Sequence, residues 1–100
     1  MVGAEIQKTR PAIVISSDAV GKLPIKLIAP LTSWKEKFSR HIWIVKIAAS
    51  STNGLSNDSG VDALQLRGVD TQRFVEKLGN ISAGELEEIT AAVASVIEYQ

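Results

Sequence analysis

The period of the apolar residues changes once along this chain, close to Ser82, and that change sets the class of fold. Before Ser82, short runs rich in β-branched residues are separated by polar turns, which is the pattern of strands in a sheet. After Ser82, apolar side chains recur every three to four residues, as on a helix that is buried along one side. The sequence therefore predicts a fold that is mainly β and ends in one α-helix.

Four runs of apolar residues predict strands, and a fifth run is a candidate for another. The four are residues 12–16, 25–30, 42–48 and 61–66, and the fifth is 73–78. Between the third and fourth runs lies a polar loop that contains the turn signal Asn53-Gly54. Strands at such short spacing, followed by a helix, favour a small and strongly bent β-barrel over residues 1–78.

The C-terminal helix is expected over residues 82–99. Ser82 and Glu85 have the spacing of a capping box, in which each side chain accepts a hydrogen bond from the other residue's backbone N–H. The side chains expected on the barrel-facing side are Leu86, Ile89, Val93, Val96 and Ile97. The helix is thus predicted to pack on the barrel, with Glu87 and Glu88 on a solvated flank.

The composition excludes several kinds of chemistry. A chain of 100 residues supports one hydrophobic core, so we expect a single domain over residues 1–100. The lack of cysteine excludes disulfides, thiolate nucleophiles and cysteine-bound metals, and the single histidine, His41, is interpreted as a surface or packing residue. The glycines lack the spacing of a nucleotide-binding loop, and we expect no cofactor. No apolar run has the length of a signal peptide or a membrane span, which predicts a cytoplasmic protein.

Charge is divided unevenly between the two halves of the chain. Residues 1–50 hold eight Lys and Arg against three Asp and Glu, whereas residues 51–100 hold three against eight. If the first half forms one face of the molecule, that face attracts a polyanion. The alternative is that the fold mixes the charges again.

Arg10 stands directly before Pro11, and a residue before proline is held in an extended conformation. Its guanidinium therefore points in a defined direction, which suits a bidentate grip on a phosphate. The alternative interpretation is a surface cation at the entrance of a strand.

Several segments, taken in order, carry a family resemblance. They are Val2–Glu5, Lys8–Ile15, Ala29–Ser33, the polar turn Gly54–Ser59, Leu64–Asp70 with Arg73, and Leu78-Gly79 before the helix. On these segments, which span nearly the whole chain, the protein resembles the MazF/PemK family of toxin endoribonucleases. The resemblance implies an SH3-like barrel of the MazF/CcdB/Kid toxin type with a C-terminal helix.

The resemblance also implies an activity and partners. Proteins of this family are homodimeric toxins of type II toxin-antitoxin systems, and they cleave single-stranded RNA, including mRNA, at short sequences without a metal ion. The expected partners are therefore single-stranded RNA, a second copy of the chain, and an antitoxin protein whose extended acidic tail fills the basic groove. The expected location is the bacterial cytoplasm.

The family's two principal catalytic positions fall on Arg10 and Thr32. The implied reaction is attack of a ribose 2′-hydroxyl on the adjacent phosphate, which leaves a cyclic phosphate and a free 5′-hydroxyl. A guanidinium suits this reaction because it stabilises charge on the phosphorane, and the Thr32 hydroxyl can donate a further hydrogen bond.

Single-stranded RNA is bound by cations and by flat side chains on which bases stack, and residues 34–41 offer both directly after Thr32. Phe38 and Trp43 have two interpretations, as part of this surface or as core and dimer-interface residues. The residues expected to contact RNA are Glu5, Lys8, Ser33, Trp34, Lys35, Lys37, Arg40 and Gln65.

Two features depart from the family's pattern. Members usually begin with a strand before the glycine-glutamate loop, and here Met1 stands at that loop, so we expect the first barrel strand to be missing and a sheet edge to be exposed. Some members place an arginine and an aspartate before the glutamine matched by Gln65, where this chain has Asp62 and Leu64.

These departures leave two alternative functions. One is a catalytically inactive module that still binds an antitoxin. The other is a poison of DNA gyrase like the CcdB toxins, which resemble this fold. Those toxins depend on the end of the C-terminal helix, and Glu98–Gln100 does not resemble their ending.

Overall fold

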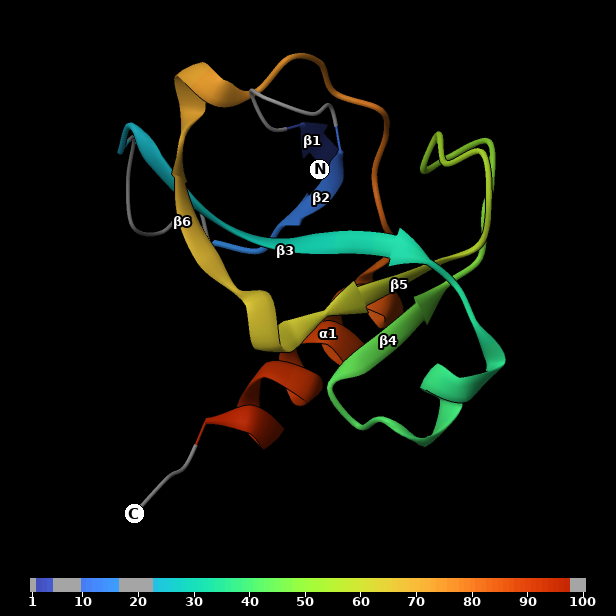
Figure 1. The fold of residues 1–100 in the computed structure, drawn as a ribbon. Helices are drawn as coiled ribbons and strands as arrows, with labels where there is room; N and C mark the ends of the chain where they lie inside the picture. The colour runs from blue at the N-terminus through green and yellow to red at the C-terminus, as the bar shows by residue number, and fades with distance from the viewer. Residues whose placement is uncertain (1, 5–9, 17–22, 98–100) are drawn as a thin grey trace.

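The computed structural model describes residues 2–4, 10–16 and 23–97, which form one bent antiparallel sheet and a C-terminal helix (Figure 1). The strands are β1 (Val2–Ala4), β2 (Pro11–Val14), β3 (Ile25–Ser33), β4 (Ile44–Ile47), β5 (Ser59–Asp62) and β6 (Arg67–Asp70). The helix is α1 (Ala83–Val96), and short 3₁₀ turns occupy η2 (Glu36–Arg40), η3 (Ala63–Gln65) and η4 (Thr71–Arg73).

β3 is the central strand of the sheet. The strand order is β1-β2-β3-β5-β4, and β6 also pairs with β3. β6 pairs with residues 25–28 of β3, and β5 pairs with residues 31–33 further along the same strand. Figure 1 shows β3 crossing the molecule from the side of β6 to the side of β5. The expected bent sheet with a C-terminal helix is confirmed, although the sheet does not close into a barrel.

Both faces of the sheet are covered by apolar side chains. Neighbouring residues of a strand point to opposite faces, so Ile13 and Ala29 face α1 whereas Ala12 and Ile28 face the other way. The core under α1 is completed by Leu31, Val45, Ile47, Val61, Ala63, Ile89 and Ala92. The smaller core on the other face contains Ala12, Ile28 and Val69.

Pro30 does not end the second predicted strand, as the sequence suggested. β3 continues to Ser33, and Pro30 lies where neither β6 nor β5 pairs with β3. Because proline has no N–H to donate, this gap between two partners is a position at which a strand tolerates it.

The strand predictions for 61–66 and 73–78 are wrong in part. β5 ends at Asp62, whose carboxylate accepts the backbone N–H of Leu64 and thereby starts the η3 turn. Residues 71–73 form η4, which Asp70 caps in the same way, and no strand follows in the described residues 74–78. β6 was not predicted, because Val69 is its single large apolar residue.

The N-terminal edge also differs from expectation. Val2–Ala4, which the sequence placed in a loop after a missing strand, forms β1 and pairs with β2 in the register Val2↔Ile13. The edge of β2 that was expected to be exposed is therefore covered along these residues.

The helix prediction is confirmed. Ser82 caps α1 through a complete capping box, with Glu85 N–H donating to the Ser82 hydroxyl at 3.0 Å and Ser82 N–H donating to the Glu85 carboxylate at 2.8 Å. Ile89 and Ala92 are buried against the sheet, whereas Leu86 is exposed and Ile97 lies just beyond the last turn. Within the described residues, none of the helices combines the length and apolar character that crossing a membrane requires.

We predict that Ser82→Ala lowers the free energy of unfolding by about 1 kcal/mol, because it leaves the Glu85 N–H without its acceptor. Urea unfolding at a fixed protein concentration measures this loss. Ser95→Ala is the matched control, since the exposed Ser95 hydroxyl donates only to a carbonyl of its own helix. It should change the free energy by less than about 0.5 kcal/mol. Equal losses in the two variants would contradict the capping role.

Candidate functional site

The register of β2 against β3 relates the two expected catalytic residues, Arg10 and Thr32, to each other. Ala12 pairs with Pro30 and Val14 pairs with Ile28. The same register, continued two residues past the end of this pairing, places Arg10 opposite Thr32. Both residues are exposed. Thr32 also pairs with Gly60 on its other side, so it lies inside the sheet and not on a free loop.

Thr32 points to the face of the sheet that α1 does not cover. Its neighbour Leu31 is buried in the core under α1, and successive side chains of a strand alternate between faces. The same face carries Gly60 of β5 and Lys46 of β4, because Thr32 pairs with Gly60 and Gly60 pairs with Lys46. We call the row Thr32, Gly60 and Lys46 the open-face row.

The missing side chain of Gly60 makes room for Ile44, and two aromatic rings lie nearby on the same face. A Cβ atom at Gly60 would lie 2.8 Å from Ile44 Cγ2, 3.5 Å from Trp34 Cε3 and 3.7 Å from Phe38 Cδ2. The two rings therefore lie over Gly60. Gly60 is buried, although it is on the face of the sheet that α1 does not cover.

The Trp34 side chain is fixed from several directions. Its backbone N–H donates to the Asp58 carbonyl at 3.0 Å, which extends the pairing of β3 with β5 by one residue. Its indole N–H donates to a carboxylate oxygen of Glu36 at 3.3 Å. Phe38 meets the ring edge to face at 5.9 Å, and the Lys46 ammonium lies 5.4 Å from the ring centroid. Trp34 is thus held beside Thr32 in one orientation.

The aromatic contacts continue towards the core. Phe38 lies 6.0 Å from the ring of His41, and His41 stacks on Trp43 at 4.6 Å with an angle of 7° between the planes. Trp43 packs against the core under α1, and Phe38 covers Gly60. The structure therefore gives His41 a packing position, as interpreted from the sequence, and gives Trp43 a place at the core.

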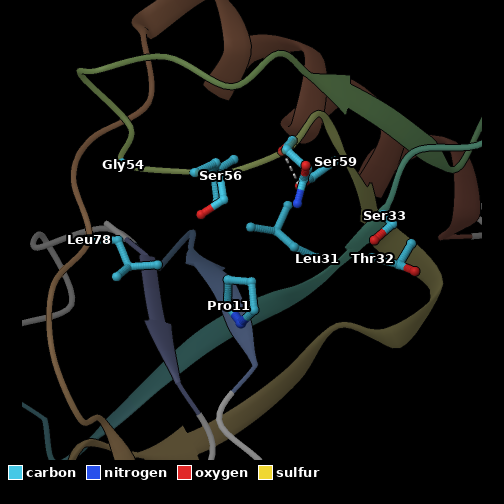
Figure 2. A pocket seen from close by; sticks show the side chains of 10 residues that line it. Pro11, Leu31, Thr32, Ser33, Gly54, Ser56, Ser59 and Leu78 are labelled. Carbon is cyan, nitrogen blue, oxygen red and sulfur yellow. Dashed lines mark hydrogen bonds between the residues drawn. The ribbon is translucent and has the colours of Figure 1, made fainter.

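A cavity of about 340 Å³ opens between the end of β3 and the loop that precedes β5 (Figure 2). Figure 2 shows Ser56 pointing from the loop towards Leu31 and Pro11, with Thr32 and Ser33 at the side of the view and Leu78 across from them. Among the residues that the structure describes, those that line the cavity carry no ionisable side chain: Pro11, Leu31, Thr32, Ser33, Gly54, Leu55, Ser56, Asn57, Ser59 and Leu78.

The loop over the cavity is held by two side chains. Asn53, of which 2% is exposed, accepts the backbone N–H groups of Ser50 and Leu55 and donates to the carbonyl of Ala48. The Asp58 carboxylate accepts the Ala49 N–H at 2.9 Å. These bonds set the path of the loop, and the Asp58 carbonyl connects it to Trp34.

Glycine is required where this loop meets the segment before α1. Gly54 has a φ of 68°, and a Cβ there would lie 2.1 Å from the Leu78 carbonyl oxygen. A Cβ at Gly79 would lie 2.3 Å from the Thr52 carbonyl oxygen. The close approach of the two backbones places Leu78 at the cavity.

The other expected RNA-contacting residues are distributed around this region. Ser33 lines the cavity, and Lys35, Lys37 and Arg40 are exposed in and just before η2. Gln65 lies at the opposite end of β5 from the cavity, and its amide donates to the Asp62 carboxylate at 3.1 Å. Glu5 and Lys8 lie outside the described residues. Lys46 was missed, because a single lysine in an apolar strand gives no signal until the strand pairing is known.

Within residues 2–4, 10–16 and 23–97, no group of three or more His, Asp or Glu side chains is arranged to hold a metal ion. The chemistry that the site offers comes from a guanidinium, hydroxyl groups, ammonium groups and aromatic rings. This set can bind and polarise a phosphodiester and can stack on bases.

Comparisons with known proteins agree with this arrangement. A family model described as PemK-like, MazF-like toxin of type II toxin-antitoxin system matches residues 1–97. Endoribonuclease MazF9 of Mycobacterium tuberculosis is 28% identical over 97 residues, which cover 91% of this chain and 80% of that protein. The solved structure of the M. tuberculosis toxin MazF-mt6 has a TM-score of 0.78 at 19% identity and covers 94% of this chain and 92% of its own. A crystal structure of MazE-MazF from Deinococcus radiodurans has a TM-score of 0.65 at 26% identity, with 87% and 82% covered.

We predict that Gly60→Ala destabilises the fold by about 1–3 kcal/mol, because the added methyl group overlaps Ile44 Cγ2. Urea unfolding measures the loss. Gly84→Ala is the control, since its Cβ would meet nothing nearer than the Ser82 hydroxyl at 3.9 Å. That change, inside α1, should stabilise by up to about 1 kcal/mol. A Gly60→Ala variant as stable as wild type would contradict the packing described.

Proposed function

The chain belongs to the PemK-like, MazF-like toxin family of type II toxin-antitoxin systems, and on that premise we propose that it is an endoribonuclease. The substrate is single-stranded RNA, mRNA included, which the protein cuts at short sequences. The mycobacterial relative, itself named an endoribonuclease, supports this proposal.

One observation carries the proposal for the site. In support of it, the β2–β3 register, continued two residues beyond its last pair, gives Arg10 and Thr32 facing positions, and both residues are exposed. A guanidinium and a hydroxyl on one open face can together donate three hydrogen bonds to the same phosphate, one more than the guanidinium donates in a bidentate contact. Arg10 and Thr32 are therefore proposed as the catalytic residues.

The proposed reaction uses the RNA's own nucleophile. The ribose 2′-hydroxyl gives up its proton to solvent and its oxygen attacks the adjacent phosphorus, the bond from phosphorus to the 5′-oxygen breaks, and the 5′-oxygen takes up a proton from solvent. The products are a 2′,3′-cyclic phosphate and a free 5′-hydroxyl. Negative charge increases on the phosphorane oxygens, and donors aimed at that charge lower the barrier most. Arg10 supplies two N–H groups and Thr32 supplies one O–H, and we propose that no metal ion takes part.

The surroundings of Thr32 support RNA as the ligand. Exposed Lys35, Lys37 and Arg40 follow Trp34, and single-stranded RNA is bound by this combination of cations and an aromatic ring. The described lining of the cavity beside Thr32 and Ser33 is uncharged, which suits a neutral base better than a phosphate. Glu5, Lys8 and Gln65 remain proposed RNA contacts from the resemblance alone.

We propose two protein partners as well. The related protein from D. radiodurans was crystallised as MazE-MazF, and the basic residues near Trp34 suit an antitoxin with an extended acidic tail. The second partner is another copy of the chain in a homodimer. The whole chain acts as one domain, in the bacterial cytoplasm where mRNA is available.

We predict that Arg10→Ala and Thr32→Val each lower RNA cleavage by at least about 100-fold, the effect of losing one donor to transition-state charge. The substrate is a long, unstructured RNA in EDTA, and mapping of the fragment ends identifies the motif and the cyclic phosphate. Circular dichroism verifies that both variants are folded.

Thr90→Val is the matched control, because Thr90 is exposed on α1 and its hydroxyl donates only to the Leu86 carbonyl. This variant should cleave at the wild-type rate. Cleavage at the wild-type rate by Arg10→Ala would overturn the site assignment. A folded wild-type protein that binds an acidic antitoxin tail and cuts no RNA would favour an inactive binding module.

A further inference from the structure

Lys46 occupies the end of the open-face row, and the proposed reaction gives it no role. We propose that Lys46 binds a phosphate of the RNA next to the phosphate held by Thr32, with the Trp34 indole between the two under the intervening nucleotide. This inference rests on the proposed function and specifies how that site binds its substrate.

The strand pairing sets the distance between Thr32 and Lys46. Gly60 pairs with Thr32 on one side and with Lys46 on the other, so two strand spacings separate the two Cα atoms. At about 4.8 Å per spacing, this separation is roughly 10 Å. The flexible stem of lysine allows its ammonium to move over much of that interval.

The space between the two residues is occupied by Trp34. Its Cε3 atom lies 3.5 Å from the Cβ position at Gly60, the middle residue of the row. The Lys46 ammonium lies 5.4 Å from the centroid of the same ring. Across the face, the Thr32 hydroxyl is therefore followed by the Trp34 indole and then by the Lys46 ammonium. This order matches a phosphate, a base and the next phosphate along a single strand of RNA.

The neighbouring carboxylates are already engaged. Asp62 at the end of β5 and Asp58 directly before β5 each lie two residues from Gly60, diagonally across from Lys46. The side chain of Asp58 accepts the Ala49 N–H, and that of Asp62 accepts donors from Leu64 and Gln65. The ammonium of Lys46 contacts the Trp34 ring instead, and the residue is exposed.

A phosphate competes well for this ammonium. The attraction between an exposed ammonium and an indole is weak, whereas a hydrogen bond between two charged groups is among the stronger contacts in proteins. When RNA binds, Lys46 moves from the indole to the phosphate, and the face of Trp34 that it leaves becomes available for a base. The movement of Lys46 thus makes both the contact with the phosphate and the stacking of a base on Trp34 possible.

The test compares Lys46→Met, which keeps the length of the stem and removes the charge, with Lys46→Arg, which restores a charge. Lys26→Met is the matched control. It loses the same charge, and it lies six residues before Thr32 on β3, roughly 20 Å away. The probe for binding is a labelled single-stranded RNA with every ribose 2′-O-methylated, so that no 2′-hydroxyl is free to attack.

Lys46→Met should reduce the slope of log Kobs against log salt concentration by about 0.7, the contribution of one phosphate contact to a single strand. Lys46→Arg and Lys26→Met should keep the wild-type slope. With unmodified RNA, Lys46→Met should raise KM by about fivefold to tenfold and leave kcat unchanged, because the contact is equally strong before and during the reaction.

The outcomes separate the two proposals. A Lys46→Met protein with the wild-type slope and the wild-type KM overturns the role of Lys46 and leaves the endoribonuclease proposal standing. Equal losses in Lys46→Met and Lys26→Met also overturn it, since they would show an effect of net charge alone. A folded wild-type protein that neither binds the methylated RNA nor cuts the unmodified RNA overturns the proposed function itself.

Discussion

The pairing of β3 with three other strands is the constraint on which the rest of the structure depends. β6 and β5 occupy successive parts of one edge of β3, and β2 occupies the other edge. Because both pairings involve β3, they set the positions of Arg10, just before β2, and of Gly60, on β5, relative to Thr32. A shift of one residue in either pairing would turn these side chains to the opposite face. The candidate site is therefore specified by sheet register more than by any loop.

The same dependence explains what the sequence predicted well. The capping box at Ser82 and the turn at Asn53-Gly54 are local patterns, and the structure confirms both because few other conformations satisfy those backbone groups. Arg10 and Thr32 came from a resemblance between segments, not from geometry. The β2–β3 register, continued beyond its last pair, adds a geometric argument for the proposal that the two residues act together, and no single segment contains that argument.

What sequence reasoning missed was decided by pairing and by side-chain hydrogen bonds. β6 has one large apolar residue, Val69, and becomes a strand because Ile25–Ile28 of β3 offers it an edge. Residues 63–65 leave the sheet because Asp62 caps a 3₁₀ turn with its own carboxylate. Lys46 looked like an interruption of an apolar strand. Only the strand pairing, in which Gly60 lies between Lys46 and Thr32, places Lys46 on the same row as Thr32.

The uneven distribution of charge along the chain corresponds to an uneven distribution over the molecule. Lys37 lies 5.8 Å from the Phe38 ring, and Lys46 lies beside Trp34, so both cations border the face that α1 leaves open. Glu87 and Glu88 are exposed on α1, which packs against the opposite face of the sheet. The fold has therefore kept these charges apart. Even at a net charge of zero, an uneven placement of charge acts on the rate of association with a charged partner before any specific contact forms.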